Sequence, residues 1–181
     1  ELDVLVGTQM LAKGLHFPSV TLVGIVSADT SLTLPDFRAA ERTFALVAQV
    51  AGRAGRGAQD GRVVVQTTLP THPAIVCAAK HDFETFAAGE LADRREHGYP
   101  PFTRLLRVVV RGLEEDRVER RAAECAERLS ALNRVTILGP ATPAVARVDG
   151  RVRRHLLAKG PASADVARAL ALLKAAPRPR G

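Results

Sequence analysis

Three short apolar runs, rich in β-branched residues, most constrain the fold of this chain. They read "VLVGT" at 4–8, "VTLVGIV" at 20–26 and "GRVVVQT" at 61–67. Continuous runs of this kind are typical of strands buried on both faces, because helices cover both sides of a parallel sheet. A stretch with helical spacing lies between the second and third runs. This order predicts an α/β fold with a parallel sheet over residues 1–70.

Helical segments follow the second run and continue past the third. Asp36, with Pro35 just before it, precedes a helix. Its apolar positions recur at helical spacing and are Phe37, Ala40, Phe44 and Val47. Residues 71–102 read as a helical linker that begins at His72-Pro73. Since Pro100-Pro101 cannot continue a helix, we place the next domain boundary there.

The last region, residues 103–181, alternates differently. It reads as a strand at 104–111, an amphipathic helix at 114–132, a strand at 134–139, a hairpin around Asp149-Gly150 and a helix at 163–175. This order, β-α-β-β-α, is that of a ferredoxin-like α+β domain without its last strand. Because the chain opens with Glu rather than Met and ends in "PRPRG", we expect a piece of a longer protein with a truncated C-terminal sheet.

The basic residues gather at one end of the chain. The net charge is +7, and residues 134–181 hold ten Lys or Arg but only two Asp or Glu, whereas the rest is nearly balanced. Such a segment can follow nucleic-acid phosphates, since each neutralised phosphate releases counterions. Arginine in an Ala-rich chain can also reflect codon usage. Aromatic residues make up only 4%, which argues against a surface that stacks bases.

The cysteines and the hydropathy indicate the cellular compartment in which the protein works. Cys77 and Cys125 stand apart, without the paired spacing of a zinc site. The helical stripe that contains Cys125 also holds Val118, Ala122, Leu129 and Leu132. No apolar stretch is long enough to span a bilayer, and no leader peptide is evident. We expect a reduced, cytoplasmic protein with no metal in this chain, and the histidines outside the motif below show no metal-ligand spacing.

The segment "QVAGRAGRG" at 49–57 places Arg53 and Arg56 three residues apart between glycines. Two side chains at this spacing lie on one face of a helical turn, and Gly52 and Gly55 leave room for close approach. A guanidinium supplied from outside a nucleotide cradle stabilises a transferring phosphoryl group, by roughly 10³–10⁵ in rate. The alternative is a glycine-rich helix end with incidental surface arginines.

The motifs before and after this segment narrow the choice. "GTQMLAKGLHFPSVTLVGIV" (7–26) and "PDFRAAERTFALVAQVAGRAGR" (35–56) resemble motifs V and VI of superfamily 2 helicases. Together with the "YPPF" junction at 99–102, their order resembles the primosomal replication-restart helicases, the primosomal protein N′ family. That resemblance implies an ATP-driven 3′-to-5′ DNA translocase acting at stalled forks. It also implies that residues 1–70 are the later part of a second RecA-like lobe.

The resemblance implies roles for individual residues. Arg53 and Arg56 would be catalytic groups at the ATP phosphates. Nucleotide sensing would fall to Gln49, Gly52, Gly14 and His16, and contacts to the DNA backbone to Thr8, Gln9 and Lys13. Without the resemblance, these last three are a polar turn between a strand and a helix, and His16 is an ordinary capping or solvent-facing residue. Ser27 departs from the family pattern, which more often has Asp there.

The resemblance also implies cofactors and partners. ATP and Mg²⁺ would be bound mainly by a first lobe, because no phosphate loop ending in Gly-Lys-Ser/Thr and no acidic magnesium-binding box occur in this sequence. The family's zinc-binding cysteines would precede the chain. Forked or single-stranded DNA, the single-strand-binding protein and other primosome proteins are the implied partners, with no membrane. Two alternatives stay open: another superfamily 2 repair helicase, and a non-catalytic DNA-binding adaptor with a relic motor lobe.

The hairpin is the second candidate DNA contact. Arg147, Arg151, Arg153 and Lys159 lie on or beside it. Since side chains alternate along a strand, Arg151, Arg153 and Lys159 should share one face, and Arg154 should point to the other. We predict that the first face contacts DNA phosphates without reading bases. The competing interpretation is a solvated sheet edge whose arginines deter strand pairing.

Overall fold

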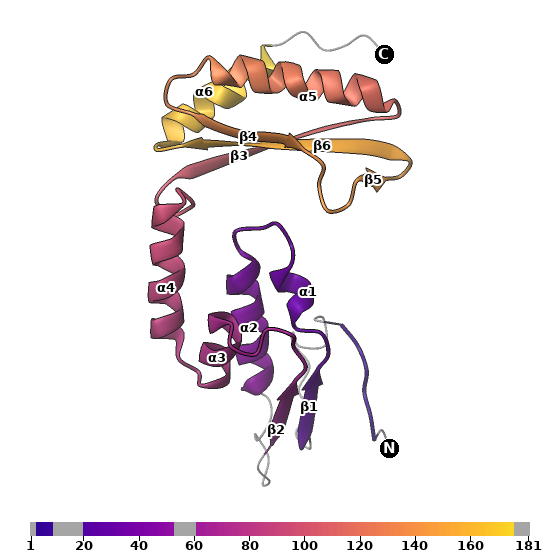
Figure 1. The fold of residues 1–181 in the computed structure, drawn as a ribbon, viewed down its shortest axis with the longest axis vertical. Coiled ribbons are helices and arrows are strands. Elements are labelled where there is room, and N and C mark those ends of the chain that lie inside the picture. The colour runs from indigo at the N-terminus through magenta and orange to yellow at the C-terminus, as the bar shows by residue number, and fades with distance from the viewer. Residues whose placement is uncertain (1–2, 9–19, 53–60, 176–181) are drawn as a thin grey trace. The chain divides into compact units, whose positions relative to one another are not determined.

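The computed structural model describes residues 3–8, 20–52 and 61–175, which fall into two units, Glu1–Ala92 and Asp93–Gly181 (Figure 1). The first unit contains β1 (Leu22–Ile25), α1 (Asp29–Leu32), α2 (Ala39–Ala51), β2 (Arg62–Val65) and α3 (Pro73–Ala79). Helix α4 (Phe83–Glu96) contains the boundary between the units. The second unit continues with β3 (Arg104–Gly112), α5 (Glu115–Ser130), β4 (Thr136–Ala141), β5 (Arg147–Val148), β6 (Arg151–Gly160) and α6 (Ser163–Lys174). The division into residues 1–70, 71–102 and 103–181 stays a prediction.

The first unit is built on a parallel pair of strands, as the apolar runs predict. Leu22 of β1 lies opposite Arg62 of β2, and Ile25 lies opposite Val65. Helix α2 supplies the core through Phe44 and Val47, which are 8% and 1% exposed. The ring of Phe44 stacks on that of Phe86, with the centroids 4.3 Å apart. Burial of these apolar side chains is the main favourable contribution to the stability of this unit.

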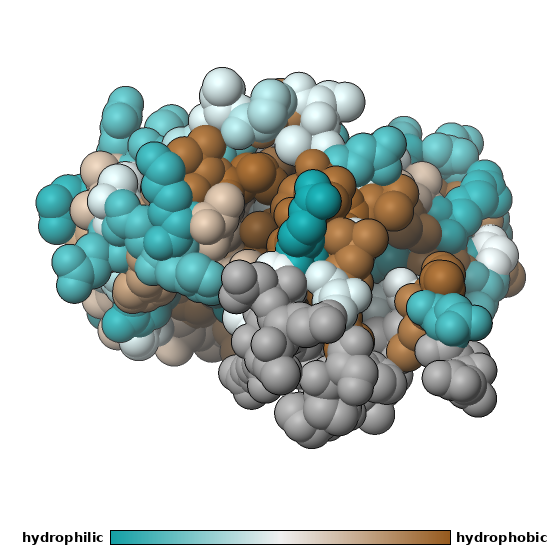
Figure 2. All heavy atoms as spheres, turned by 90° about the horizontal axis from the view of Figure 1, so that it is seen from below, coloured by the Kyte–Doolittle hydropathy of each residue, from teal (hydrophilic) through white to brown (hydrophobic). Residues whose placement is uncertain are grey.

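Two expectations for this unit are wrong. Residues 4–8 form no strand, and Val4 and Val6 are 76% and 88% exposed. An apolar run favours burial, but a strand also needs a hydrogen-bonding partner, and no described strand pairs with this run. Strands β1 and β2 are also not buried on both faces, since their exposure alternates and Leu22 is 60% exposed. Seen from below, the molecule shows hydrophobic side chains at its surface (Figure 2).

Helix α3 begins where the sequence predicts. His72 is its N-cap, and the imidazole Nδ1 accepts the backbone N–H of Ala74 at 3.1 Å. Pro73 occupies the first helical turn, where its missing N–H costs no hydrogen bond. Cys77 is buried and unpaired in the core that α3 shares with α2. Helix α2, in contrast, begins at Ala39 rather than directly after Asp36, whose carboxylate accepts the backbone N–H of Arg38 at 3.0 Å.

The second unit has an antiparallel sheet with the strand order β3-β6-β4, and β5 also pairs with β6. The hairpin between β5 and β6 turns at Asp149 and Gly150, whose φ angles are +51° and +72°. Two consecutive positive φ values are typical of the tight turn that suits the twist of a two-stranded ribbon. The predicted hairpin is therefore confirmed.

Helices α5 and α6 cover one face of this sheet (Figure 1). Leu129 of α5, Leu156 and Ala158 of β6 and Ala169 of α6 are all fully buried in their common core. The predicted stripe of α5 is confirmed, with Val118, Ala122 and Leu129 buried and Cys125 partly buried. Within this unit, the helices α5 and α6 leave the other face of the sheet open. In the part of the chain that the structure describes, no helix is long and apolar enough to cross a membrane.

Candidate nucleic-acid interface

The open face of the second sheet is defined by strand register. Arg107 lies opposite Leu157, Val109 opposite His155, and Arg111 opposite Arg153. Residues directly opposite in an antiparallel pair point to the same face. The alternate pairs, such as Val108 with Leu156, belong to the core beneath the helices. The odd-numbered side chains of β3 and β6 therefore share the face that α5 and α6 do not cover.

This open face is basic. It carries Arg107 and Arg111 from β3 together with Arg151, Arg153, His155 and Lys159 from β6. None of the strands β3 to β6 contains an Asp or Glu. Within the described residues, the four arginines form no ion pair. The helical side differs, because α5 and the residue before it hold six acidic side chains among four arginines. The open face is thus a surface of positive potential suited to an anionic partner.

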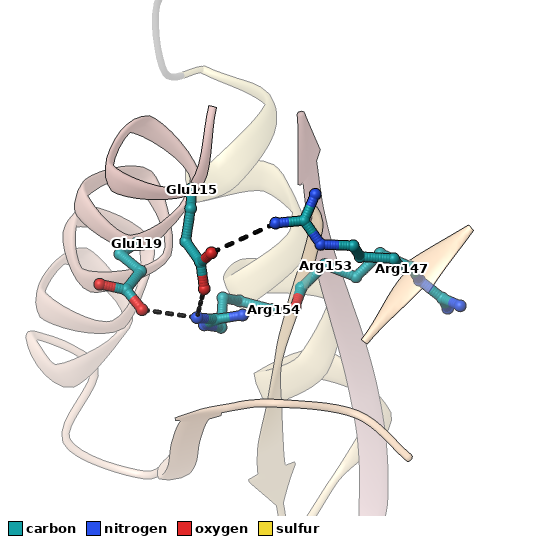
Figure 3. Close-up of polar contacts among 5 residues, drawn as sticks. All are labelled: Glu115, Glu119, Arg147, Arg153 and Arg154. Carbon is teal, nitrogen blue, oxygen red and sulfur yellow. Dashed lines mark hydrogen bonds and ion pairs between the residues drawn. The ribbon is translucent and has the colours of Figure 1, made fainter. Parts of the chain in front are cut away.

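The opposite face of the hairpin has its charges neutralised (Figure 3). Arg154 is only 12% exposed, and its guanidinium lies 2.8 Å from Glu115 and 2.5 Å from Glu119 of α5. Hydrogen bonds to Glu119 and Glu115 raise the pKa of Arg154. Arg147 also turns to Glu115, at 3.5 Å, whereas Arg153 points away from α5. Arg154 is therefore on the predicted side.

The hairpin arginines do not form one cluster. Arg147 lies opposite Val152 in the register, and Arg151 lies opposite Val148. Arg147 consequently lies on the helical face with Arg154, apart from the basic set of the open face. Arg151, Arg153 and Lys159 share the open face, as alternation predicts.

Lys159 marks the other end of the open face. Its Nζ lies 3.7 Å from the centroid of the Tyr99 ring and donates to the carbonyl of His97 at 2.9 Å. The junction that contains "YPPF" thus holds this cation in place, through a cation–π contact and a charge-assisted hydrogen bond. The ammonium group of Lys159 is therefore held in position before any anion binds to it.

His155 occupies the middle of the open face. Its register partners are Val109 on β3 and Ala141 on β4, neither of which has a side chain that can bond to the ring. Nδ1 is buried and has no hydrogen-bond partner among the described residues. Burial lowers the pKa of His155, and the neighbouring charges of Arg107 and Arg153 lower it further. The ring is therefore held neutral in a cationic setting.

The first unit's residues expected to act in catalysis, to sense nucleotide or to contact DNA are only partly described. Arg53, Arg56, Gly14 and His16 lie outside the described residues, as do Gln9 and Lys13. Gln49 is exposed near the end of α2, and the backbone N–H of Gly52 closes that helix on the carbonyl of Ala48 at 3.0 Å. Thr8 lies in an exposed segment that forms no strand. Their roles stay predictions.

The carboxyl ends of β1 and β2 are joined by Asp29. Its carboxylate accepts the hydroxyl of Thr67, and it accepts the backbone N–H and the hydroxyl of Thr68 at 2.7 and 2.9 Å. The bond from Thr67 is the main cause of its lowered pKa, followed by the backbone bond from Thr68. Ligands of α/β sheets bind at this end of the strands. Asp29 therefore fixes the two loops that border such a position.

Residues 95–181 match the family model of the primosomal protein N C-terminal domain, which places the second unit in that class of domains. Three relatives called replication restart protein PriA are similar over most of the chain. The protein of Treponema pallidum (strain Nichols) is 49% identical over 89% of this chain and 25% of its own length. Those of Bacillus subtilis (strain 168) and Synechocystis sp. (strain ATCC 27184 / PCC 6803 / Kazusa) are 47% and 44% identical, over 87% and 89% of this chain. The chain belongs to the family of replication restart protein PriA.

The chain spans a quarter or less of the length of these relatives, with 20% covered in the latter two.

Sequence reasoning missed three residues of the open face, Arg107, Arg111 and His155. Alternation places the two arginines on one face of β3, but only the pairing of β3 with β6 brings them beside Arg153 and His155. That pairing joins segments more than forty residues apart, and no local pattern specifies it.

Proposed function

We propose that this chain is the C-terminal part of an ATP-dependent 3′-to-5′ DNA translocase that acts in replication restart. In this proposal its second unit contacts forked or single-stranded DNA through the open face. Two observations on the open face carry the proposal. The four strands β3, β4, β5 and β6 contain no Asp or Glu, and the four arginines on this face have no carboxylate partner among the described residues. Such a face binds phosphates whatever the base sequence.

The folds of both units support this assignment without fixing it. The order β3-α5-β4, in which β3 and β4 flank β6, agrees with the split arrangement of a ferredoxin-like domain. The parallel pair β1-β2 with α2 agrees with part of a RecA-like lobe. The exposed apolar side chains of β1 and β2 would then be covered by the rest of that lobe in a longer protein.

The proposed ATP chemistry concerns the whole protein. Arg53 and Arg56 would stabilise charge on the transferring phosphoryl group from across the lobe interface. This chain does not itself fit ATP, because its sequence has no phosphate loop and no acidic magnesium box, and its described residues hold no cluster of potential metal ligands. Nucleotide, Mg²⁺ and zinc would therefore depend on residues that precede it, and the single-strand-binding protein would be a partner of the whole assembly.

A salt titration tests the proposed DNA contact. The affinity of the chain for an oligothymidine strand is measured at several salt concentrations, for the wild type and for Arg151→Ala/Arg153→Ala. Loss of phosphate contacts should make the slope of log affinity against log salt shallower by about 0.7 per contact on single-stranded DNA. Replacing oligothymidine by a mixed sequence should change the affinity little.

The matched control removes the same charge from the helical side. Arg120 of α5 and Arg168 of α6 are exposed and lie on the helices rather than on the open face. Arg120→Ala/Arg168→Ala should therefore leave the salt slope close to that of the wild type. Equal losses in the two double variants would mean that net charge, and not the open face, determines binding, and the proposed contact would be wrong.

A further inference from the structure

The open face contains a group of cations that is unfavourable without a ligand. Arg111 and Arg153 lie directly opposite each other on neighbouring strands and point to the same face. Like charges in this position destabilise a sheet. No carboxylate of the described residues pairs with either guanidinium, and β3, β4 and β6 supply none. An anion bound between the two would remove the repulsion.

His155 lies next to three arginines of the open face, Arg107, Arg111 and Arg153. It is two residues from Arg153 along β6, and its register partner Val109 is two residues from both Arg107 and Arg111. Diagonal neighbours on one face of a sheet are about 7–8 Å apart, within reach of long side chains. On its other side β4 presents Ala141, and no acidic group of β3, β4 or β6 faces the ring. A phosphate held by the arginines would be the nearest negative charge to the imidazole.

We propose that a phosphodiester group of DNA binds between Arg107, Arg111 and Arg153, and that His155 takes up a proton when it binds. The proposal rests on the proposed function and names the site and its proton linkage. In the free protein, partial burial and the arginines hold the pKa of His155 down and keep the ring neutral. The phosphate offsets the arginine charges, so the imidazolium is stabilised and gains a second N–H donor.

The sign of the linkage follows from this direction. The pKa of His155 is below its usual value in the free protein and rises in the complex, so the complex holds more protons at intermediate pH. Affinity for DNA must then increase as the pH falls. For one linked proton the increase is at most about tenfold per pH unit. Phosphodiester groups and thymine do not titrate between about pH 5.5 and 8, so the response comes from the protein.

The experiment uses the chain and an oligothymidine strand without a terminal phosphate, at constant ionic strength. Fluorescence anisotropy gives the affinity from about pH 8 to 5.5 for the wild type, His155→Gln and the control His81→Gln. The glutamine amide keeps a neutral hydrogen-bonding group on the open face, whereas His81 is exposed in the first unit and lies off the strands. The wild type and the His81 variant should bind more tightly as the pH falls, whereas the His155 variant should respond clearly less.

A second measurement does not depend on the folding of a variant. Histidine-selective NMR titration of the wild type gives the pKa of His155 with and without the oligonucleotide, and the bound value should be higher. An unchanged pKa, or an equal pH response in His155→Gln, overturns this inference while the proposed DNA contact stands. If Arg111→Ala/Arg153→Ala binds as the wild type does, the proposed phosphate site is likewise wrong. The proposed function itself fails only if the wild type does not bind DNA.

Discussion

At the scale of single residues, pairing decides which arginines can serve a ligand. Arg154 and Arg153 are neighbours in sequence, yet Arg154 is held by two carboxylates of α5 whereas Arg153 has none among the described residues. The alternation of side chains along β6 separates them, and α5 provides the acids on only one side. The ion pairs of the helical face thus fix the hairpin and leave the arginines of the open face for a partner.

Asp29 supports a prediction on pH. Its pKa is lowered because the carboxylate accepts bonds from Thr67 and Thr68. A lowered pKa in the folded state means that this stabilisation is complete above the unfolded value of about 3.9 and is lost as the pH falls through the folded value. Thermal unfolding of the wild type and Asp29→Asn should therefore differ at about pH 6, and the difference should shrink as the pH is lowered below about 3.9. A difference that does not shrink in acid would contradict this role.

At the scale of elements, the sequence predicts the helices and turns that depend on local signals. The cap at His72-Pro73, the stripe of α5 and the turn at Asp149-Gly150 are all encoded within a few residues, and all are confirmed. The run at 4–8 is not, because strand formation depends on a partner elsewhere in the chain. For the same reason the sequence does not predict the complete open face, because its residues come together only through the pairing of distant strands.

Two glycines of the second sheet allow an element-level prediction. Both have positive φ, +99° at Gly139 and +72° at Gly150. A Cβ at Gly150 would meet nothing within 4 Å. Gly150→Ala should therefore lower the free energy of unfolding only by the conformational cost of a positive φ, about 1–2 kcal/mol. A Cβ at Gly139 would lie 2.8 Å from the carbonyl oxygen of His155. Gly139→Ala should thus be the more destabilising in denaturant unfolding, and equal losses would contradict the packing of β4 on β6.

At the scale of the whole molecule, the chain should be unable to turn over ATP by itself. Its sequence offers arginines for the phosphates but no phosphate loop and no acidic magnesium box, and arginine fingers alone make no nucleotide site. The purified chain should show no ATP hydrolysis above a buffer control, with or without DNA. Turnover that follows the chain through purification would show that the proposed dependence on preceding residues is wrong.

NMR mapping can locate the DNA-binding surface of the second unit residue by residue. Backbone and arginine side-chain signals of the chain are recorded while oligothymidine is added at low salt. If DNA lies on the open face, the largest changes should fall on Arg107, Arg111, Arg151, Arg153 and His155, with small changes on the exposed side of α5 and α6. The largest changes on α5 and α6, with the odd-numbered residues of β3 and β6 unaffected, would contradict it.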